Sequence, residues 1–261
     1  MMPNLAANLS MLFTELPFLE RFEAASKAGF SAVEYLFPYD YDPELLQQLL
    51  ARHNLTQALF NAPPGDWDAG ERGIACLPGR EAEFEQGIDR ALAYAAVLGN
   101  QRIHIMAGLL PVTLSADEAN ICYVRNLRYA AHKAQEVGIT LLVEPINNVD
   151  MPGYFVNYQE QGVALIGLID EPNVRLQFDC YHCQMMQGDV VATFNKLLPY
   201  IGHVQIAGVP GRHEPDVGEL NYRYIFDAFE AAGYHGYVGC EYKPKASTVD
   251  GLAWLDRLAL R

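Results

Sequence analysis

Short apolar runs alternate along the chain with longer stretches in which apolar residues recur every three or four positions. The short runs have the length of buried strands, and the longer stretches have the spacing of amphipathic helices. The pattern predicts eight strands: Leu5–Met11, Ala32–Leu36, Thr56–Ala62, Arg102–Gly108, Thr140–Ile146, Val174–Asp179, His203–Gly208 and Tyr237–Tyr242. It also predicts eight helices: Phe18–Ala28, Pro43–His53, Glu81–Leu98, Ser115–Val137, Gln159–Ile169, Asp189–Pro199, Tyr222–Ala232 and Thr248–Leu258.

The regular alternation of strands and helices indicates parallel pairing through right-handed crossovers. The 261 residues, shared among eight units of about 33 residues, suit one closed (β/α)₈ TIM barrel that spans residues 1–261. An open doubly wound sheet is the competing architecture. Gly29, Gly99, Gly138 and Gly233 fall just after helical stretches, where a left-handed C-terminal cap favours glycine.

One predicted connection, residues 62–80, is too long to be a simple turn. It is rich in Pro and Gly, contains Trp67, and follows the third strand. Long loops in compact domains are usually functional or disordered, and in a barrel this one lies on the catalytic face. We interpret it as a cover over an active site, with Trp67 either closing over the site or anchoring the loop by burial. A packed surface loop is the alternative.

Polar residues end four consecutive apolar runs in the second half of the chain. Glu144, Asp179, Gln205 and Glu241 are separated by 35, 26 and 36 residues, each close to one barrel unit. They are therefore expected side by side at one part of the barrel mouth. Three carboxylates this close would repel one another unless a cation neutralised them. The all-oxygen set favours Mg²⁺ or Mn²⁺ over structural zinc, and the alternative is that each residue is a strand-end group capped by a neighbour.

Composition excludes several classes of partner. The net charge of −14 argues against a nucleic acid and against an anionic membrane surface. No apolar run is long enough to span a bilayer and no cationic leader is visible, so a cytoplasmic protein is expected. The five scattered cysteines fit reduced thiols. Cys180 and Cys183 match C-x-x-C spacing, but the barrel context disfavours a redox motif.

The chain resembles the hydroxypyruvate isomerase family, within the xylose isomerase-like TIM barrels, over nearly its whole length. The resemblance lies in the segments AANLSMLFTE, VEYLFPYDY, GDWDAGERGIACLPGRE, LLVEPIN, DMPGYF, QFDCYH, GHVQIAG, RHEPDVGELNY and GCEYKP. It implies that Glu144, Asp179, Gln205 and Glu241 hold the metal, and that Glu144 and Glu241 are the catalytic proton donor and acceptor. The implied reaction converts hydroxypyruvate to tartronate semialdehyde through an enediolate.

The substrate implied by the resemblance is a small hydroxy-oxo acid, and its carboxylate needs local positive charge. Arg72, Arg80, Arg212 and Lys243 are candidates, with Arg72 and Arg212 preferred because a guanidinium grips a carboxylate with two hydrogen bonds. His182, three residues after Asp179, is expected to bind a substrate hydroxyl or to support a ligand, unless it is an ordinary loop histidine. His203 is expected to pack inside the barrel, and His213 and Glu214 to hold the loop after the seventh strand.

Other functions remain as alternatives. A 2-oxo-tetronate isomerase would act on the four-carbon homologue, and several quoted segments suit it equally well. A ketose 3-epimerase would need a wider pocket. An endonuclease IV-like enzyme would need further zinc ligands and a basic face, and a non-catalytic binding protein would not need all four ligand positions filled. A homo-oligomer is left open.

Overall fold

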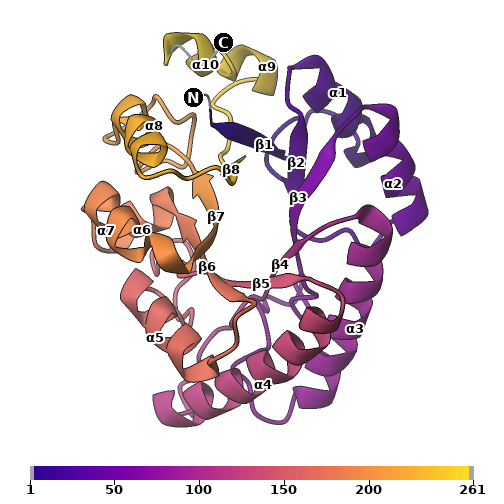
Figure 1. The fold of residues 1–261 in the computed structure, drawn as a ribbon, viewed down its shortest axis with the longest axis vertical. Coiled ribbons are helices and arrows are strands. Elements are labelled where there is room, and N and C mark those ends of the chain that lie inside the picture. The colour runs from indigo at the N-terminus through magenta and orange to yellow at the C-terminus, as the bar shows by residue number, and fades with distance from the viewer. Residues whose placement is uncertain (1–2, 259–261) are drawn as a thin grey trace.

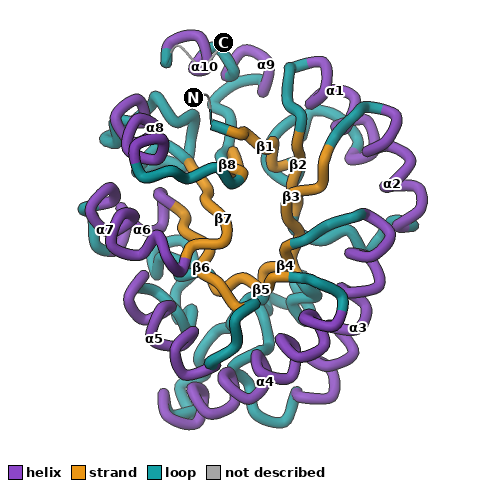
Figure 2. The backbone as a smooth tube through the Cα atoms, in the orientation of Figure 1, coloured by secondary structure: helices purple, strands orange, loops and turns teal. Residues whose placement is uncertain are grey.

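The computed structural model describes residues 3–258, in which eight parallel strands close into a barrel. Each strand pairs with the next along the chain, and the first pairs with the last, so the barrel is closed rather than an open doubly wound sheet. Figures 1 and 2 show the strands as an inner ring surrounded by helices. The strands are β1 (Asn4–Asn8), β2 (Ala32–Tyr35), β3 (Thr56–Asn61), β4 (Arg102–His104), β5 (Thr140–Val143), β6 (Val174–Asp179), β7 (Ile201–Ile206) and β8 (Tyr237–Cys240).

The helices pack around the outside of the barrel. They are α1 (Arg21–Lys27), α2 (Pro43–Arg52), α3 (Glu81–Leu98), α4 (Ala116–Glu136), α5 (Gln159–Ile169), α6 (Cys180–Met186), α7 (Val190–Leu197), α8 (Tyr222–Ala231), α9 (Thr248–Gly251) and α10 (Trp254–Arg257), with 3₁₀ turns η1 (Phe18–Glu20) and η2 (Leu198–Tyr200). The four cap glycines have φ between 67° and 94°, which confirms their predicted role. None of the described helices is long and apolar enough to cross a membrane.

The predicted helix Thr248–Leu258 is wrong, because two short helices replace it. Its first residue is tied to the segment after β1, since the Thr248 hydroxyl accepts a hydrogen bond from the Phe13 amide at 2.6 Å. Its second half is tied to the end of the barrel, since the Trp254 indole donates to the Tyr242 hydroxyl at 2.9 Å. Two anchors on different parts of the barrel leave no room for one straight helix.

The sequence pattern missed α6, which begins directly after β6 without a connecting loop. The Asp179 carboxylate accepts a hydrogen bond from the Tyr181 amide at 2.7 Å and so caps the first turn of α6. The same residue therefore ends a strand and starts a helix.

Several predicted strands end too late, and β4 shows why. Its pairing stops at His104 rather than at Gly108, because the chain then meets the long loop. Ala107 forms a bridge to Gly73, and a Cβ on Gly73 would lie 2.3 Å from the Met106 carbonyl oxygen. Residues 62–80 are thus anchored on the exit of β4, and only a glycine permits the close approach.

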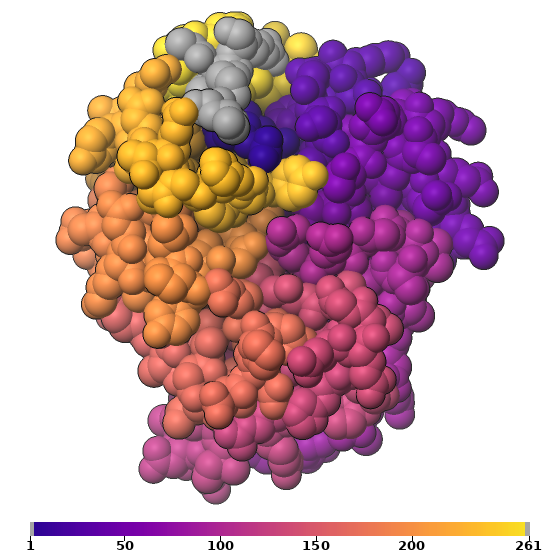
Figure 3. Space-filling view, viewed as in Figure 1, coloured from indigo at the N-terminus to yellow at the C-terminus, as the bar shows by residue number. Residues whose placement is uncertain are grey.

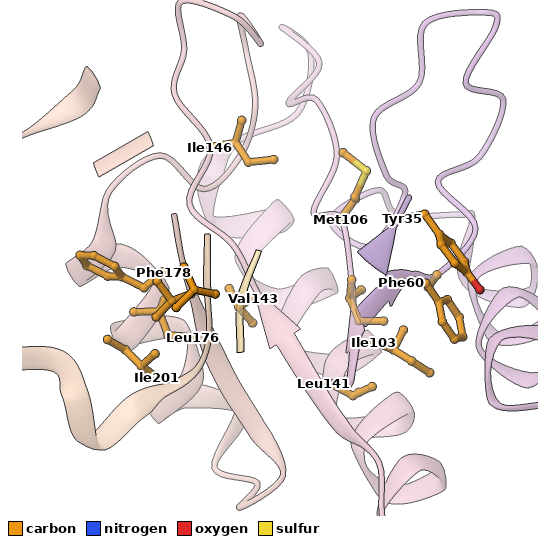
Figure 4. Close-up of a cluster of buried hydrophobic side chains, with 14 of the residues drawn as sticks. Tyr35, Phe60, Ile103, Met106, Leu141, Val143, Ile146, Leu176, Phe178 and Ile201 are labelled. Atoms are coloured by element: carbon orange, nitrogen blue, oxygen red, sulfur yellow. The ribbon is translucent and has the colours of Figure 1, made fainter. Parts of the chain in front are cut away.

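The apolar core lies between the strands and the helices. Figure 4 shows part of this core, with Phe178 near Leu176 and Ile201 on one side and Ile103 near Phe60 on the other. Phe178 meets Phe194 of α7 at a ring distance of 5.6 Å. Alternate positions of the same strands point into the barrel, so the polar residues at strand ends face inward.

The first and last strands meet at the seam of the barrel. β1 and β8 pair in parallel from Asn4 opposite Tyr237 to Ala7 opposite Cys240. In Figure 3 indigo atoms from the first part of the described chain lie near yellow atoms from its last part. Closure of this seam brings groups from the first and last strands together inside the barrel.

Candidate active site

A cavity of about 530 Å³ opens at the carboxyl ends of the strands. Glu144, directly after β5, and Glu241, directly after β8, line it. Asp179 and Gln205 are completely or almost completely buried behind this lining. Of the six residues suggested to contact a substrate, Arg80 is not among the lining residues, and the other five line the cavity: Trp67, Arg72, His182, Arg212 and Lys243.

The guanidinium of Arg212 lies among the carboxylates. Its Nη2 is 2.5 Å from Glu241 Oε1 and 3.5 Å from Asp179 Oδ2. Burial acts to lower the pKa of Arg212, but the two carboxylates outweigh it and raise that pKa. Arg212 has φ 53°, a conformation that costs a side-chain-bearing residue free energy. The loop after β7 thus holds a strained backbone that points a cation into the site.

Burial raises the pKa values of the site carboxyls. Burial raises the pKa of Glu241 to about 8 and that of Asp179 to about 6, against the opposing effect of Arg212. Burial raises the pKa of Glu144 well above its usual value, and the charges of Glu241 and Asp179 raise it further. One guanidinium is therefore not enough to offset three buried carboxylates.

Two carboxylate oxygens of this group have no hydrogen-bond partner. Glu144 Oε1 and Asp179 Oδ2 are fully buried and accept no hydrogen bond. Potential ligand atoms of Glu144, Asp179 and His182 lie within 4.8 Å of one another. Buried polar atoms are normally satisfied, so unpaired acceptors of this kind fit a cation that binds oxygen.

His182 faces these oxygens with a nitrogen that carries its proton. The backbone amide of Asn147 and its side-chain Nδ2 both donate to His182 Nδ1, at 3.3 and 2.7 Å. The Asn147 amide orientation is itself fixed, because its Oδ1 accepts from the amides of Val149 and Asp150. An imidazole nitrogen that accepts cannot carry the ring proton, so Nε2 carries it. Nε2 lies 3.5 Å from Asp179 Oδ2, and in this tautomer it presents a proton rather than a lone pair, so His182 is not arranged as a metal ligand.

Gln205 forms hydrogen bonds with both ends of its side-chain amide. Its Nε2 donates to Glu34 Oε1 at 2.8 Å and to Glu241, and its Oε1 accepts from Gln177 Nε2 at 2.6 Å. Gln205 thus belongs to a polar network inside the barrel as well as to the row of strand ends. His203 is buried in the same network, as predicted, and pairs with Glu34 at 2.7 Å.

The long loop, residues 62–80, contributes two stacked side chains to the cavity, Arg72 and Trp67. The Arg72 guanidinium stacks over the Trp67 ring at 3.8 Å, and the ring packs edge-on against Phe37 at 5.1 Å. Arg80 points elsewhere, because its guanidinium forms ion pairs with Glu71 and Glu83. The suggestion that Arg80 binds substrate is therefore wrong, since Arg80 neutralises acidic residues of its own loop and helix.

Several residues of the site were missed by the sequence reasoning. His104, at the end of β4, lies 3.5 Å from Glu144, and burial lowers its pKa to about 3, so it is neutral. Asp150 and Tyr181 line the cavity and share a 2.7 Å hydrogen bond. Glu34 and His104 carry the same signal that identified Glu144, namely a polar residue within or at the end of an apolar run.

The C-x-x-C pair has no redox geometry. Cys180 and Cys183 are buried free thiols in α6. Burial raises the pKa of Cys183 to about 12 and that of Cys180 well above its usual value, so the reactive thiolate is disfavoured.

Comparison with known proteins places the chain in a family. A family model described as xylose isomerase-like TIM barrel matches residues 22–258. The chain is 55% identical to a 2-oxo-tetronate isomerase of Cupriavidus necator over 97% of this chain and 98% of that protein. It is 48% identical to the hydroxypyruvate isomerase of Escherichia coli, with 98% and 99% covered.

A solved structure agrees closely with the fold. A crystal structure from Brucella melitensis, titled as an AP endonuclease of family 2, superposes with a TM-score of 0.96 at 51% identity, covering 98% of this chain and 99% of that one. Together with the closed barrel and the acidic strand ends, these matches show that the chain is an isomerase that belongs to the hydroxypyruvate isomerase family of xylose isomerase-like TIM barrels.

Proposed function

We propose that the chain is a metal-dependent isomerase of a short hydroxy-oxo acid, which converts hydroxypyruvate to tartronate semialdehyde. The observation that carries the proposal is the pair of glutamates, Glu144 and Glu241, that enter one cavity from different strand ends with Asp179 buried beside them. The reaction moves a proton between neighbouring carbons, so it needs one group to remove the proton and another to return it.

Four residues would hold a divalent cation, with Mg²⁺ or Mn²⁺ preferred: Glu144, Asp179, Gln205 and Glu241. Their donors are all oxygens, as these hard ions require, and two of the carboxylate oxygens lack any hydrogen bond. When bound, the cation would supply Lewis-acid stabilisation of negative charge that develops on the substrate oxygens.

One of the two glutamates would remove a proton from the hydroxyl-bearing carbon, and the other would deliver a proton to the neighbouring carbon. A group works best as acid or base when its pKa lies near the working pH, and burial raises the pKa of Glu241 to about 8. Arg212 holds Glu241 in place through Nη2 and so fixes the position of one proton-transfer group. Glu144 would act from the end of β5, where His104 lies 3.5 Å from it.

The remaining cavity residues would bind and enclose the acid. Arg72 and Arg212 provide guanidinium groups for the substrate carboxylate, and Lys243 adds charge at the rim. His182 would donate a hydrogen bond from Nε2 to a substrate oxygen. Trp67 would cover the site and exclude water from the enediolate.

A 2-oxo-tetronate is the second candidate substrate, and the 55% identity to an enzyme of that name favours it. The cavity does not exclude the extra carbon, because about 530 Å³ falls within the range of pockets that hold larger ligands. Both acids share the reacting carbonyl and hydroxyl groups, so the roles assigned above apply to either.

The test is a substrate panel on enzyme that has been stripped of metal and reconstituted with Mg²⁺ or Mn²⁺. We expect turnover of hydroxypyruvate or a 2-oxo-tetronate only after reconstitution. Glu144→Gln and Glu241→Gln should each lower kcat by about 10²–10⁴-fold, the usual range for general acid–base groups. The control is Glu214→Gln, because Glu214 is about as buried as Glu144 but is not among the residues that line the cavity. Near-normal turnover in both site variants, or turnover of a free ketohexose and neither acid, would overturn the proposal.

A further inference from the structure

We propose that Glu34 is a positioning residue that orients the amide of Gln205, so that its oxygen rather than its nitrogen is available to the cation. The inference rests on the proposed function, since it concerns one of the four proposed ligands. Glu34 lies on β2, across the barrel from the row of strand ends, and it is fully buried.

The Glu34 carboxylate is surrounded by donors. Its Oε1 accepts from Asn8 Nδ2 at 3.0 Å and from Gln205 Nε2 at 2.8 Å, and its Oε2 pairs with His203 Nε2 at 2.7 Å. The barrel wall makes room for this group at Gly239, where a Cβ would lie 2.3 Å from Oε1 and 2.4 Å from Oε2. The chain therefore encloses a carboxylate at a place where any other residue at position 239 would displace it.

The direction of these hydrogen bonds decides the orientation of the Gln205 amide. A carboxylate only accepts, whereas an amide has a donor end and an acceptor end. Glu34 and Glu241 both take the donor end of Gln205, so its oxygen must point away from them, toward Gln177 on the cavity wall. A reversed amide would place oxygen against two carboxylates and lose both hydrogen bonds.

The orientation matters because the amide nitrogen has no lone pair to offer a cation, whereas the amide oxygen does. Groups that hydrogen-bond to a metal ligand commonly control its orientation, and their removal typically costs about 10- to 100-fold in metal affinity. Glu34 does not line the cavity, so the inference assigns it no contact with substrate.

The experiment measures Mn²⁺ binding by isothermal titration calorimetry on the metal-free protein. We expect Glu34→Gln to raise the Kd for Mn²⁺ about 10- to 100-fold, because glutamine at this position can face Gln205 with either end of its amide. Glu34→Asp keeps the charge but draws the acceptor back by one methylene group, and it should weaken binding in the same direction. This second variant also serves if Glu34→Gln does not fold.

The matched control is Glu214→Gln. Glu214 is also a buried glutamate packed over a glycine, since a Cβ on Gly251 would lie 2.4 Å from its Oε1, but it contacts none of the proposed ligands. We expect its Kd to stay within about twofold of the unmodified protein, below the effect typical of groups that support a ligand.

The possible failures are distinguishable. If the unmodified protein does not bind Mn²⁺, the metal-dependent function proposed above fails. If it binds Mn²⁺ and both Glu34 variants bind with an unchanged Kd, only the role of Glu34 fails. If Glu34→Gln binds Mn²⁺ as tightly as the unmodified protein while Glu34→Asp is weakened, a group that only accepts is not needed at this position and the orientation argument is refuted.

Discussion

Replacing Arg212 by methionine would test whether this guanidinium holds the acidic site together in the absence of metal. Methionine keeps an unbranched apolar stem and, like arginine, carries a Cβ at φ 53°, so the backbone strain is unchanged. The variant removes the positive charge that lies 2.5 Å from Glu241 and 3.5 Å from Asp179. The substitution therefore isolates the electrostatic contribution.

The magnitude follows from the geometry of the ion pairs. Unit charges about 4 Å apart interact by roughly 4 kcal/mol at an effective dielectric constant of about 20. Protonation of a carboxyl group limits the loss, and breaking a buried pair typically costs about 3–5 kcal/mol. For a domain of this size each kcal/mol lowers Tm by about 2–4 °C, so we expect a decrease of about 6–20 °C.

The assay is thermal unfolding in the presence of a chelator, followed by titration with Mn²⁺. Added Mn²⁺ should recover more stability in the variant than in the unmodified protein, because the cation replaces the missing charge. Arg223→Met is the control, since Arg223 forms an exposed pair with Asp227 at 3.4 Å that contributes only about 0.3–0.5 kcal/mol. A metal-free Arg212→Met protein that unfolds within about 2 °C of the unmodified protein would refute the reasoning.

Three further results are expected. The metal-free protein should lose stability as pH rises from about 5 to 8, because burial raises the folded-state pKa of Asp179 to about 6 and of Glu241 to about 8, so the folded state binds protons that the unfolded state releases. Saturating Mn²⁺ should flatten this slope, and a metal-free stability that rises with pH through this window would contradict the prediction. Asn147→Asp should move the ring proton of His182 from Nε2 to Nδ1, because a carboxylate oxygen would replace the donor at 2.7 Å; ¹⁵N NMR of the ring reports the tautomer, and an unchanged spectrum would refute the assignment. Trp67→Ala should raise KM by about 5- to 30-fold, which corresponds to the roughly 1–2 kcal/mol of the cation–π contact that holds Arg72, and it should change kcat less. An unchanged KM would mean that Trp67 only anchors the loop.

The strand order and the row of acidic residues could be predicted because they depend on a local period. A repeat of about one strand and one helix places Glu144, Asp179 and Glu241 at equivalent heights whatever the details of packing. The closed barrel confirms that reasoning for the fold. The helix after β6 could not be found in the same way, because Asp179 serves both elements and leaves no turn residues between them.

The partners of the site residues could not be predicted, because they come from strands far away in the sequence. Glu34 belongs to β2, and its contact with Gln205 depends on how the barrel closes rather than on spacing along the chain. The proton position on His182 depends on an Asn147 amide that is fixed by two backbone groups of its own turn. Such hydrogen-bond directions follow from three-dimensional contacts and are not contained in a pattern of apolar and polar positions.

The seam between β1 and β8 also bears on the order of events in folding. Asn8 donates to Glu241 at 2.9 Å although 233 residues separate them. Closing so long a loop costs more entropy than forming contacts between neighbouring units, so we expect this contact to form late. The proposed cation would need Glu241 together with Glu144 and Asp179, so it would bind only after that late event. Added divalent ions should therefore slow unfolding much more than they speed refolding, so that the cation acts chiefly on the lifetime of the finished barrel.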